Sequence, residues 1–232
     1  MKTTLFVFLV FLSVFAFGQD EQLRTDWASL RKYAADNKAL GDPVPGEQRV
    51  VFMGNSITEA WRTIDSCFFA NKSYICRGIG GQTSPQMLVR FRQDVIALKP
   101  SVVVILSGTN DIAGNTGPMT LEETLGNIVS MAELAKANGI RVVLSSVLPA
   151  YDFPWRPGLQ PAGKILALNA IVKSFCTASN TVYVDYYSAM VDERMGLDKK
   201  YADDGVHPTI AGYRIMEPLV EEAIAEALGQ ER

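Results

Sequence analysis

Five short runs of aliphatic and β-branched residues, separated by stretches with helical features, constrain the fold of this chain most. Several runs are unbroken rather than alternating, a pattern typical of parallel strands that are covered on both faces. Strands that alternate with helices predict an open, doubly wound α/β sheet in one domain with three α/β/α layers. The five expected strands are Val50 to Met53, Tyr74 to Cys76, Val102 to Leu106, Val142 to Ser145 and Val182 to Val184.

The expected helices have recognisable ends. Ser84 followed by Pro85 predicts an N-cap before a first-turn proline. Thr120 and Glu123 are spaced as in a capping box, and the helix that they open is expected to end near Asn138. Apolar residues at helical spacing predict further helices. These cover Gln22 to Asn37, Lys164 to Cys176 and Ile210 to Leu228.

Residues 1–18 are expected to be a cleaved signal peptide. Lys2 supplies a positive start, residues 5–17 are apolar, and Ala16 and Gly18 are small residues in the positions that favour cleavage. A membrane anchor and a buried strand are the alternatives, but the apolar run is shorter than the roughly 20 residues that span a bilayer. We therefore expect an exported protein, periplasmic or extracellular, whose folded domain comprises residues 19–232.

Composition argues against several classes of function. With 232 residues and a net charge of −3, the chain fits one globular domain without a basic patch for nucleic acid. It has no second apolar run that could span a membrane. One histidine and no Cys-x-x-Cys argue against a structural zinc site. Three cysteines leave at least one unpaired, and a bridge between Cys67 and Cys76 stays open beside the simpler view of buried thiols.

Three expected strands are followed by segments that carry reactive or hydrogen-bonding groups. These segments lie at the edge of the sheet where doubly wound folds bind ligands. Ser56 follows the first strand, where its hydroxyl is either a nucleophile or a helix cap. Glycines at 78, 80 and 81 follow the second strand, and either expose backbone N–H groups or form a turn. Asn110 follows the third strand, where its amide either donates to an oxyanion or lies in a turn.

The only histidine, His207, lies three residues after Asp204. Histidine is the side chain best suited to proton transfer near neutral pH. A carboxylate at this spacing can fold onto the imidazole and fix its tautomer, as in a catalytic triad. Asp203 is the rival carboxylate, and an ordinary loop histidine before the last helix is the alternative to a catalytic base. Together with Ser56, these residues indicate a serine hydrolase.

The four segments, in this order, resemble the conserved blocks of the SGNH hydrolases, also called GDSL-type esterases. The Ser, Gly, Asn and His of those blocks match Ser56, Gly81, Asn110 and His207. The resemblance extends from about residue 49 to the last helix, and residues 78–81 look like the platelet-activating-factor acetylhydrolase branch. It implies a flavodoxin-like five-stranded parallel sheet.

The resemblance also implies a set of roles for these residues. Ser56 would be the nucleophile, and Asp204 would orient His207. The oxyanion hole would consist of the Ser56 and Gly81 N–H groups and the Asn110 side chain, with Gly80 as the alternative to Gly81. Asn55 departs from the family by standing where Asp is usual, and its hydrogen bonding is expected to preserve the loop.

The implied reaction is ester hydrolysis through a covalent acyl-enzyme, without metal or cofactor. The acetylhydrolase branch suggests a short acyl group, and export suggests a carbohydrate ester or another small-molecule ester as substrate. A lipase, lysophospholipase or thioesterase acting on longer acyl chains is the enzymatic alternative. A catalytically silent binding module of the same fold is the alternative from another class.

The signal peptide gives a direct prediction. The exported protein is expected to begin at Gln19, because Ala16 and Gly18 are the small residues that define the cleavage site. N-terminal sequencing of secreted or periplasmic material checks this. Recovery of a chain that still carries residues 1–18 would contradict it.

Overall fold

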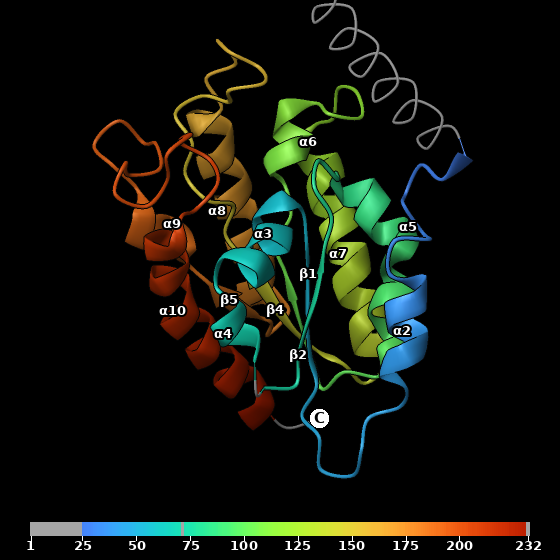
Figure 1. Cartoon of the computed structure of the whole chain (residues 1–232). Coiled ribbons are helices and arrows are strands. Elements are labelled where there is room, and N and C mark those ends of the chain that lie inside the picture. Colours follow the sequence, from blue (N-terminus) through green and yellow to red (C-terminus); the bar gives the residue numbers. More distant parts are fainter. Residues whose placement is uncertain (1–24, 71, 231–232) are drawn as a thin grey trace, which may run out of the picture.

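The computed structural model describes residues 25–70 and 72–230. The expected signal peptide and the cleavage point before Gln19 lie outside these residues. A parallel sheet of order β2-β1-β3-β4-β5 forms the centre of the molecule, which confirms the predicted doubly wound, flavodoxin-like fold (Figure 1). The strands are β1 (Val50–Gly54), β2 (Tyr74–Gly78), β3 (Val102–Ile105), β4 (Arg141–Ser145) and β5 (Val182–Val184).

Strand β1 lies between β2 and β3 in the sheet. Its first residue, Val50, is in register with Tyr74 on one side and Val102 on the other. All five residues of β1 are buried, because helices cover both faces. The carboxyl ends of β1, β2 and β3 therefore open onto the same edge of the sheet.

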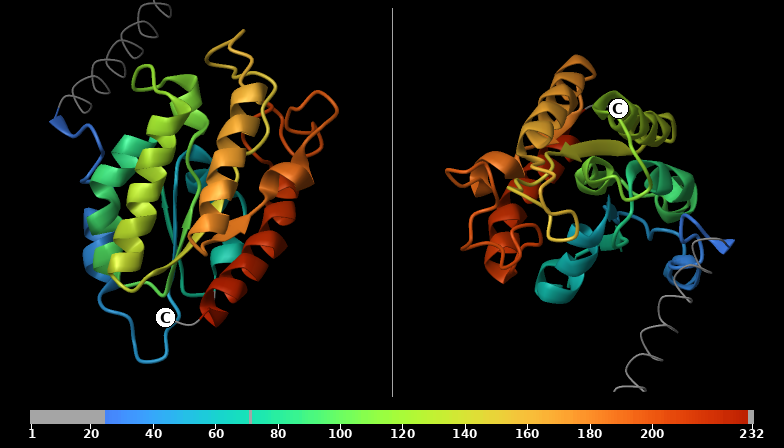
Figure 2. Two further views of the ribbon diagram at one scale, coloured as in Figure 1. Left: turned by 180° about the vertical axis from the view of Figure 1, so that it is seen from behind. Right: turned by 90° about the horizontal axis from the view of Figure 1, so that it is seen from above.

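Helices form the two outer layers (Figure 2). The helices are α2 (Ala34–Leu40), α3 (Ser56–Ile64), α4 (Ser66–Phe69), α5 (Ser84–Asp94), α6 (Thr109–Ala113), α7 (Leu121–Ala137), α8 (Ala162–Ala178), α9 (Tyr186–Met190) and α10 (Ile210–Gly229), with a 3₁₀ turn at Ile96–Leu98. Helices α5, α7 and α8 pack on one face of the sheet, and α3, α4, α9 and α10 pack on the other. Within the described residues, no helix is both long and apolar enough to cross a bilayer.

The predicted helix over Gln22 to Asn37 is wrong for most of its described length. Residues 27–33 form turns, and a helix begins only at Ala34. The Asp26 carboxylate accepts hydrogen bonds from the Leu30 and Arg31 N–H groups at 2.7 and 3.0 Å, in place of a helical carbonyl. Ser29 has a φ of +54°, which a right-handed helix cannot accommodate.

The capping box at the start of α7 is confirmed. The Thr120 hydroxyl accepts the Glu123 N–H at 3.1 Å, and the Glu123 carboxylate accepts the Thr120 N–H at 2.7 Å. At α5 the expected N-cap is displaced by one residue, since the helix begins at Ser84 and Thr83 precedes it as the cap. Gln86 accounts for the shift, because its side-chain oxygen accepts the Thr83 N–H at 3.0 Å in a capping box.

Two glycines let the start of α3 lie against the ends of β1 and β2. A Cβ on Gly54 would stand 2.0 Å from Thr58 Oγ1, and one on Gly78 would stand 2.2 Å from the backbone nitrogen of Glu59. Real side chains cannot occupy such positions without moving the helix. Glycine at these two strand ends is therefore what brings Ser56 close to the loop after β2.

The close approach at Gly78 generates a stability prediction. We expect Gly78→Ala to lower the free energy of unfolding by about 2 kcal/mol or more, because the new methyl group overlaps rigid backbone. Gly126→Ala in α7 is the matched control: its Cβ meets nothing within 4 Å, so better helix propensity should stabilise by up to about 1 kcal/mol. Urea unfolding of both variants measures the difference, and equal midpoints would refute the packing explanation.

Candidate active site

The structure brings Ser56, His207 and Asp204 into one hydrogen-bonded chain. Ser56 Oγ lies 2.8 Å from His207 Nε2, although the two residues are 151 positions apart. His207 Nδ1 lies 2.7 Å from Asp204 Oδ2. The serine stands at the first position of α3, while the histidine and aspartate lie in the loop that leads into α10. Hydroxyl, imidazole and carboxylate therefore have the connectivity of a catalytic triad.

Asp204 holds the histidine through both of its carboxylate oxygens. Oδ1 accepts the backbone N–H groups of Val206 and His207 at 2.9 and 2.8 Å, which leaves Oδ2 for the ring. Partial burial acts to raise the pKa of Asp204, but these hydrogen bonds from His207 and Val206 outweigh it and hold the pKa below its ordinary value. Asp203 takes no part in this network.

The carboxylate also fixes which imidazole nitrogen carries the proton. An ionised carboxylate only accepts hydrogen bonds, so the neutral His207 ring must place its hydrogen on Nδ1. Its Nε2 is then the acceptor that faces the Ser56 hydroxyl. The side chains of His207 and Asp204 are 33% and 42% exposed, so solvent and substrate can reach the ring.

Asn55, where the family usually has Asp, serves as the N-cap of α3. Its side-chain oxygen accepts the Ile57 N–H at 3.1 Å, and the residue is almost fully buried. A neutral amide oxygen thus makes the cap contact that a carboxylate would make. The Ser56 N–H at the helix start has no partner among the described residues and stays available to a ligand.

The glycine loop after β2 offers one free N–H group and one that is occupied. Gly80 donates its N–H to Glu59 Oε2 at 2.6 Å. Gly81 has a φ of +74°, and its N–H has no partner in the part of the chain that the structure describes. Of the two candidates, Gly81 is the one with a donor still available.

The Asn110 amide is buried and held from two sides. Its Nδ2 donates to the Gln82 carbonyl at 2.9 Å, and its Oδ1 accepts from Asn115 Nδ2 at 3.0 Å. An amide NH₂ carries two hydrogens, so one donor remains after the bond to Gln82. Asn115 also reaches the Gly81 carbonyl at 3.2 Å. Nothing in the sequence marks Asn115, because only the fold reveals that it joins these two segments.

Trp155, in the aromatic loop after β4, lies near the histidine with its ring tilted against the imidazole. Its ring centroid is 6.2 Å from that of His207, and its Nε1 donates to Asn115 Oδ1 at 3.1 Å. The Trp155 ring also stacks on that of Phe153, with the two centroids 5.0 Å apart. The loop over residues 151–158 therefore forms one wall of the site.

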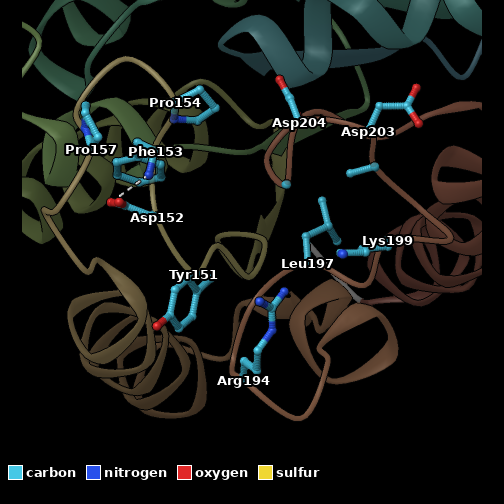
Figure 3. Close-up of a pocket in the computed structure, with 12 residues that line it drawn as sticks. Tyr151, Asp152, Phe153, Pro154, Pro157, Arg194, Leu197, Lys199, Asp203 and Asp204 are labelled. Carbon is cyan, nitrogen blue, oxygen red and sulfur yellow. Dashed lines mark hydrogen bonds between the residues drawn. The ribbon is translucent and has the colours of Figure 1, made fainter.

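Two cavities flank the triad. The larger, of about 650 Å³, lies beside the glycine loop, and its lining residues are mostly polar: Asp26, Ser29, Lys32, Glu59, Ile79, Gly80, Gly81, Gln82, Gln86, Asn115, Thr116, Trp155 and Arg156. The second cavity, of about 330 Å³, lies next to Asp204. Tyr151 and Arg194 line it from facing segments (Figure 3). Asp203 also lines this second cavity and is not part of the triad.

The cysteines stand apart from this chemistry. All three are free, so Cys67 and Cys76 are not bridged in this structure. Burial raises the pKa of the Cys76 thiol and raises that of Cys176 to about 11. Across residues 25–70 and 72–230, no three His, Cys, Asp or Glu side chains gather as a metal ion would require.

Comparison with known proteins gives the family. The model of the GDSL-like lipase/acylhydrolase family matches residues 52–215. Esterase TesA of Pseudomonas aeruginosa is 27% identical over 173 residues, which are 72% of this chain and 79% of that protein.

Two solved structures share the fold. A candidate acylhydrolase from Bacteroides fragilis is 53% identical, with a TM-score of 0.86 over 88% of this chain and 99% of the other. The acetylxylan esterase Axe2 of Geobacillus stearothermophilus is 20% identical, with a TM-score of 0.60 over 81% and 98% of the two chains. The chain belongs to the GDSL-like lipase/acylhydrolase family and is a carboxylic ester hydrolase.

Proposed function

We propose that the protein is an exported serine esterase that removes a short acyl group, most simply acetyl, from a carbohydrate. The observation that carries the proposal is the hydrogen-bonded chain from Ser56 Oγ through His207 to Asp204. Binding alone does not require these three groups in this order, whereas nucleophilic catalysis does. The expected signal peptide supports export.

The first step forms the acyl-enzyme. Ser56 Oγ attacks the ester carbonyl carbon while its proton passes to His207 Nε2. The negative charge on the carbonyl oxygen is met by the free N–H groups of Ser56 and Gly81 and by the second amide hydrogen of Asn110. When the carbon–oxygen bond to the alcohol breaks, the alcohol leaves with the proton from His207.

The second step reverses these roles with water. His207 Nε2 takes a proton from water as its oxygen attacks the acyl carbon, and a second oxyanion occupies the same donors. Collapse of that intermediate releases the carboxylic acid and returns the proton to Ser56 Oγ. Asp204 stays ionised throughout and stabilises the imidazolium, since hydrogen bonds keep its pKa below the ordinary value.

The chemistry of the flanking cavities supports a small acyl group and a polar alcohol. Most side chains that line the cavity beside Gly81 are charged, amide or hydroxyl groups, which suit a polar alcohol better than a long alkyl chain. Trp155 and Tyr151 are 39% and 52% exposed. Exposed aromatic rings among hydrogen-bonding groups suit a sugar, which has both apolar and polar faces.

The proposal is tested by turnover of p-nitrophenyl esters from acetate to palmitate. We expect kcat/KM to be highest for acetate and to fall steadily with chain length. Ser56→Ala should lose turnover and keep the wild-type unfolding midpoint, and an organophosphonate probe should label Ser56 alone. Acetylated oligosaccharides then test the alcohol.

Three results would count against the proposal. Labelling at another serine would remove Ser56 from the mechanism. A maximum at long chains would favour a lipase or thioesterase. A wild-type protein that binds acetylated sugars without hydrolysing any ester would favour a binding module.

The two neighbouring aspartates provide a matched pair of variants. We expect Asp204→Asn to lower kcat by about 10⁴-fold, because an amide can hold the wrong imidazole tautomer. Asp203→Asn removes the same charge one residue away, outside the His207 network, and should keep kcat within about twofold. Initial rates on p-nitrophenyl acetate decide between them, and the reverse pattern would make Asp203 the orienting carboxylate.

The lowered pKa of Asp204 adds a dependence on pH. Because the folded-state pKa lies below the unfolded one, ionised Asp204 stabilises the fold above the unfolded pKa. This contribution is lost as the pH falls through the folded pKa. The difference in melting temperature between wild type and Asp204→Asn should therefore shrink on acidification.

A further inference from the structure

Glu59 connects the nucleophile helix to the glycine loop. It lies three residues after Ser56 in α3, and its Oε2 accepts the Gly80 N–H at 2.6 Å. Its other oxygen pairs with the ammonium group of Lys32. One carboxylate therefore joins three segments: the helix that carries Ser56, the loop that carries Gly81, and the turns that precede α2.

Those turns belong to an N-terminal arm, residues 26–40, that lies against α5 and the glycine loop (Figure 1). Gln82 Nε2 donates to the Ala28 carbonyl at 2.8 Å, and the Tyr33 hydroxyl donates to the Gly78 carbonyl. The arm precedes residue 52, where the match to the family model begins. It contacts the glycine loop on both sides of Gly81, through Gly78 and Gln82.

The hydrogen bond between the Gly80 N–H and Glu59 affects the neighbouring free donor, the Gly81 N–H. A Cβ on Gly80 would stand 3.1 Å from Glu59 Oε2 and 3.8 Å from the Ser56 Cβ, so this part of the loop adjoins the nucleophile. Without side chains, Gly80 and Gly81 have wide backbone freedom. Because the Gly80 N–H is held, the following peptide group, which carries the Gly81 N–H, is restricted in orientation.

The ion pair alone does not account for this arrangement. The side chains of Lys32 and Glu59 are 35% and 37% exposed, and ion pairs at such exposed sites stabilise little. The hydrogen bond from Gly80 to a charged oxygen is the stronger contact, since charge-assisted bonds are shorter and stronger than neutral ones.

We propose that Glu59 is a positioning residue: through Gly80 it orients the Gly81 N–H toward the oxyanion, and Lys32 holds Glu59 in place. The inference rests on the proposed serine esterase mechanism. Glu59 does not touch the reacting atoms, so its effect belongs in kcat, where oxyanion stabilisation appears, more than in KM.

Four variants test the proposal on p-nitrophenyl acetate. Glu59→Ala should lower kcat by about 10–100-fold, the effect of misplacing a donor by about 1 Å. KM should stay within about threefold. Glu59→Gln keeps an oxygen that accepts the Gly80 N–H and should recover most of kcat, and Lys32→Met should cause a smaller loss than Glu59→Ala. Glu221→Ala is the control, because it breaks a similarly exposed pair with Lys72, which precedes β2, whereas the glycine loop follows that strand.

A second readout does not depend on catalysis. In the wild type, amide hydrogen exchange measured by NMR should be slower at Gly80 than at Gly81, and Glu59→Ala should abolish the difference. Wild-type kcat in Glu59→Ala, or a loss in Glu59→Gln as large as that in Glu59→Ala, would overturn the positioning role. So would equal exchange at the two glycines in the wild type. Continued turnover by Ser56→Ala would instead overturn the esterase mechanism itself, and this inference with it.

Discussion

The edge of the sheet that carries the candidate active site depends on the hydrogen bonds of one fully buried guanidinium group, that of Arg90. Its Nη2 donates to the Gly54 carbonyl at 3.0 Å, and its Nε donates to Gln82 Oε1 at 2.6 Å. One arginine on α5 therefore holds the strand end before Ser56 and the loop end after Gly81. Asp94 balances its charge at 3.0 Å, with neither side chain exposed. Removing one partner of such a pair typically costs about 3–5 kcal/mol.

The candidate active site combines buried and solvent-exposed parts. Asn110 and Asp111 are almost fully buried at the end of β3, and burial raises the pKa of Asp111 although Ser84 donates to it. His207 and Asp204 are instead partly exposed, on a loop fixed by short-range hydrogen bonds. The Asn110 donor is thus embedded at the sheet edge, while Gly81 and the proton-transfer groups remain open to substrate and water.

Sequence patterns predicted the parts of this molecule that depend on local chemistry. The unbroken β-branched runs gave the five strands to within two residues at each end, and the order of the loops indicated which side chains would meet. The turns at residues 27–33 were missed, because Asp26 and Ser29 act against a helix whose apolar spacing is favourable. The contacts made by Asn115 and Glu59 could not be predicted from the sequence, since each depends on partners far away along the chain.

The site uses residues both inside and outside the match to the family model. That match covers residues 52–215, which include the serine helix, the glycine loop and the histidine loop. Asp26, Ser29 and Lys32 lie before that match, yet they line the cavity beside Gly81. The groups proposed to cleave the ester all lie within the match, whereas the cavity proposed to receive the alcohol extends to residues before it. Because the arm joins the glycine loop through Gln82 and Glu59, it shapes that cavity and leaves the three strand ends in place.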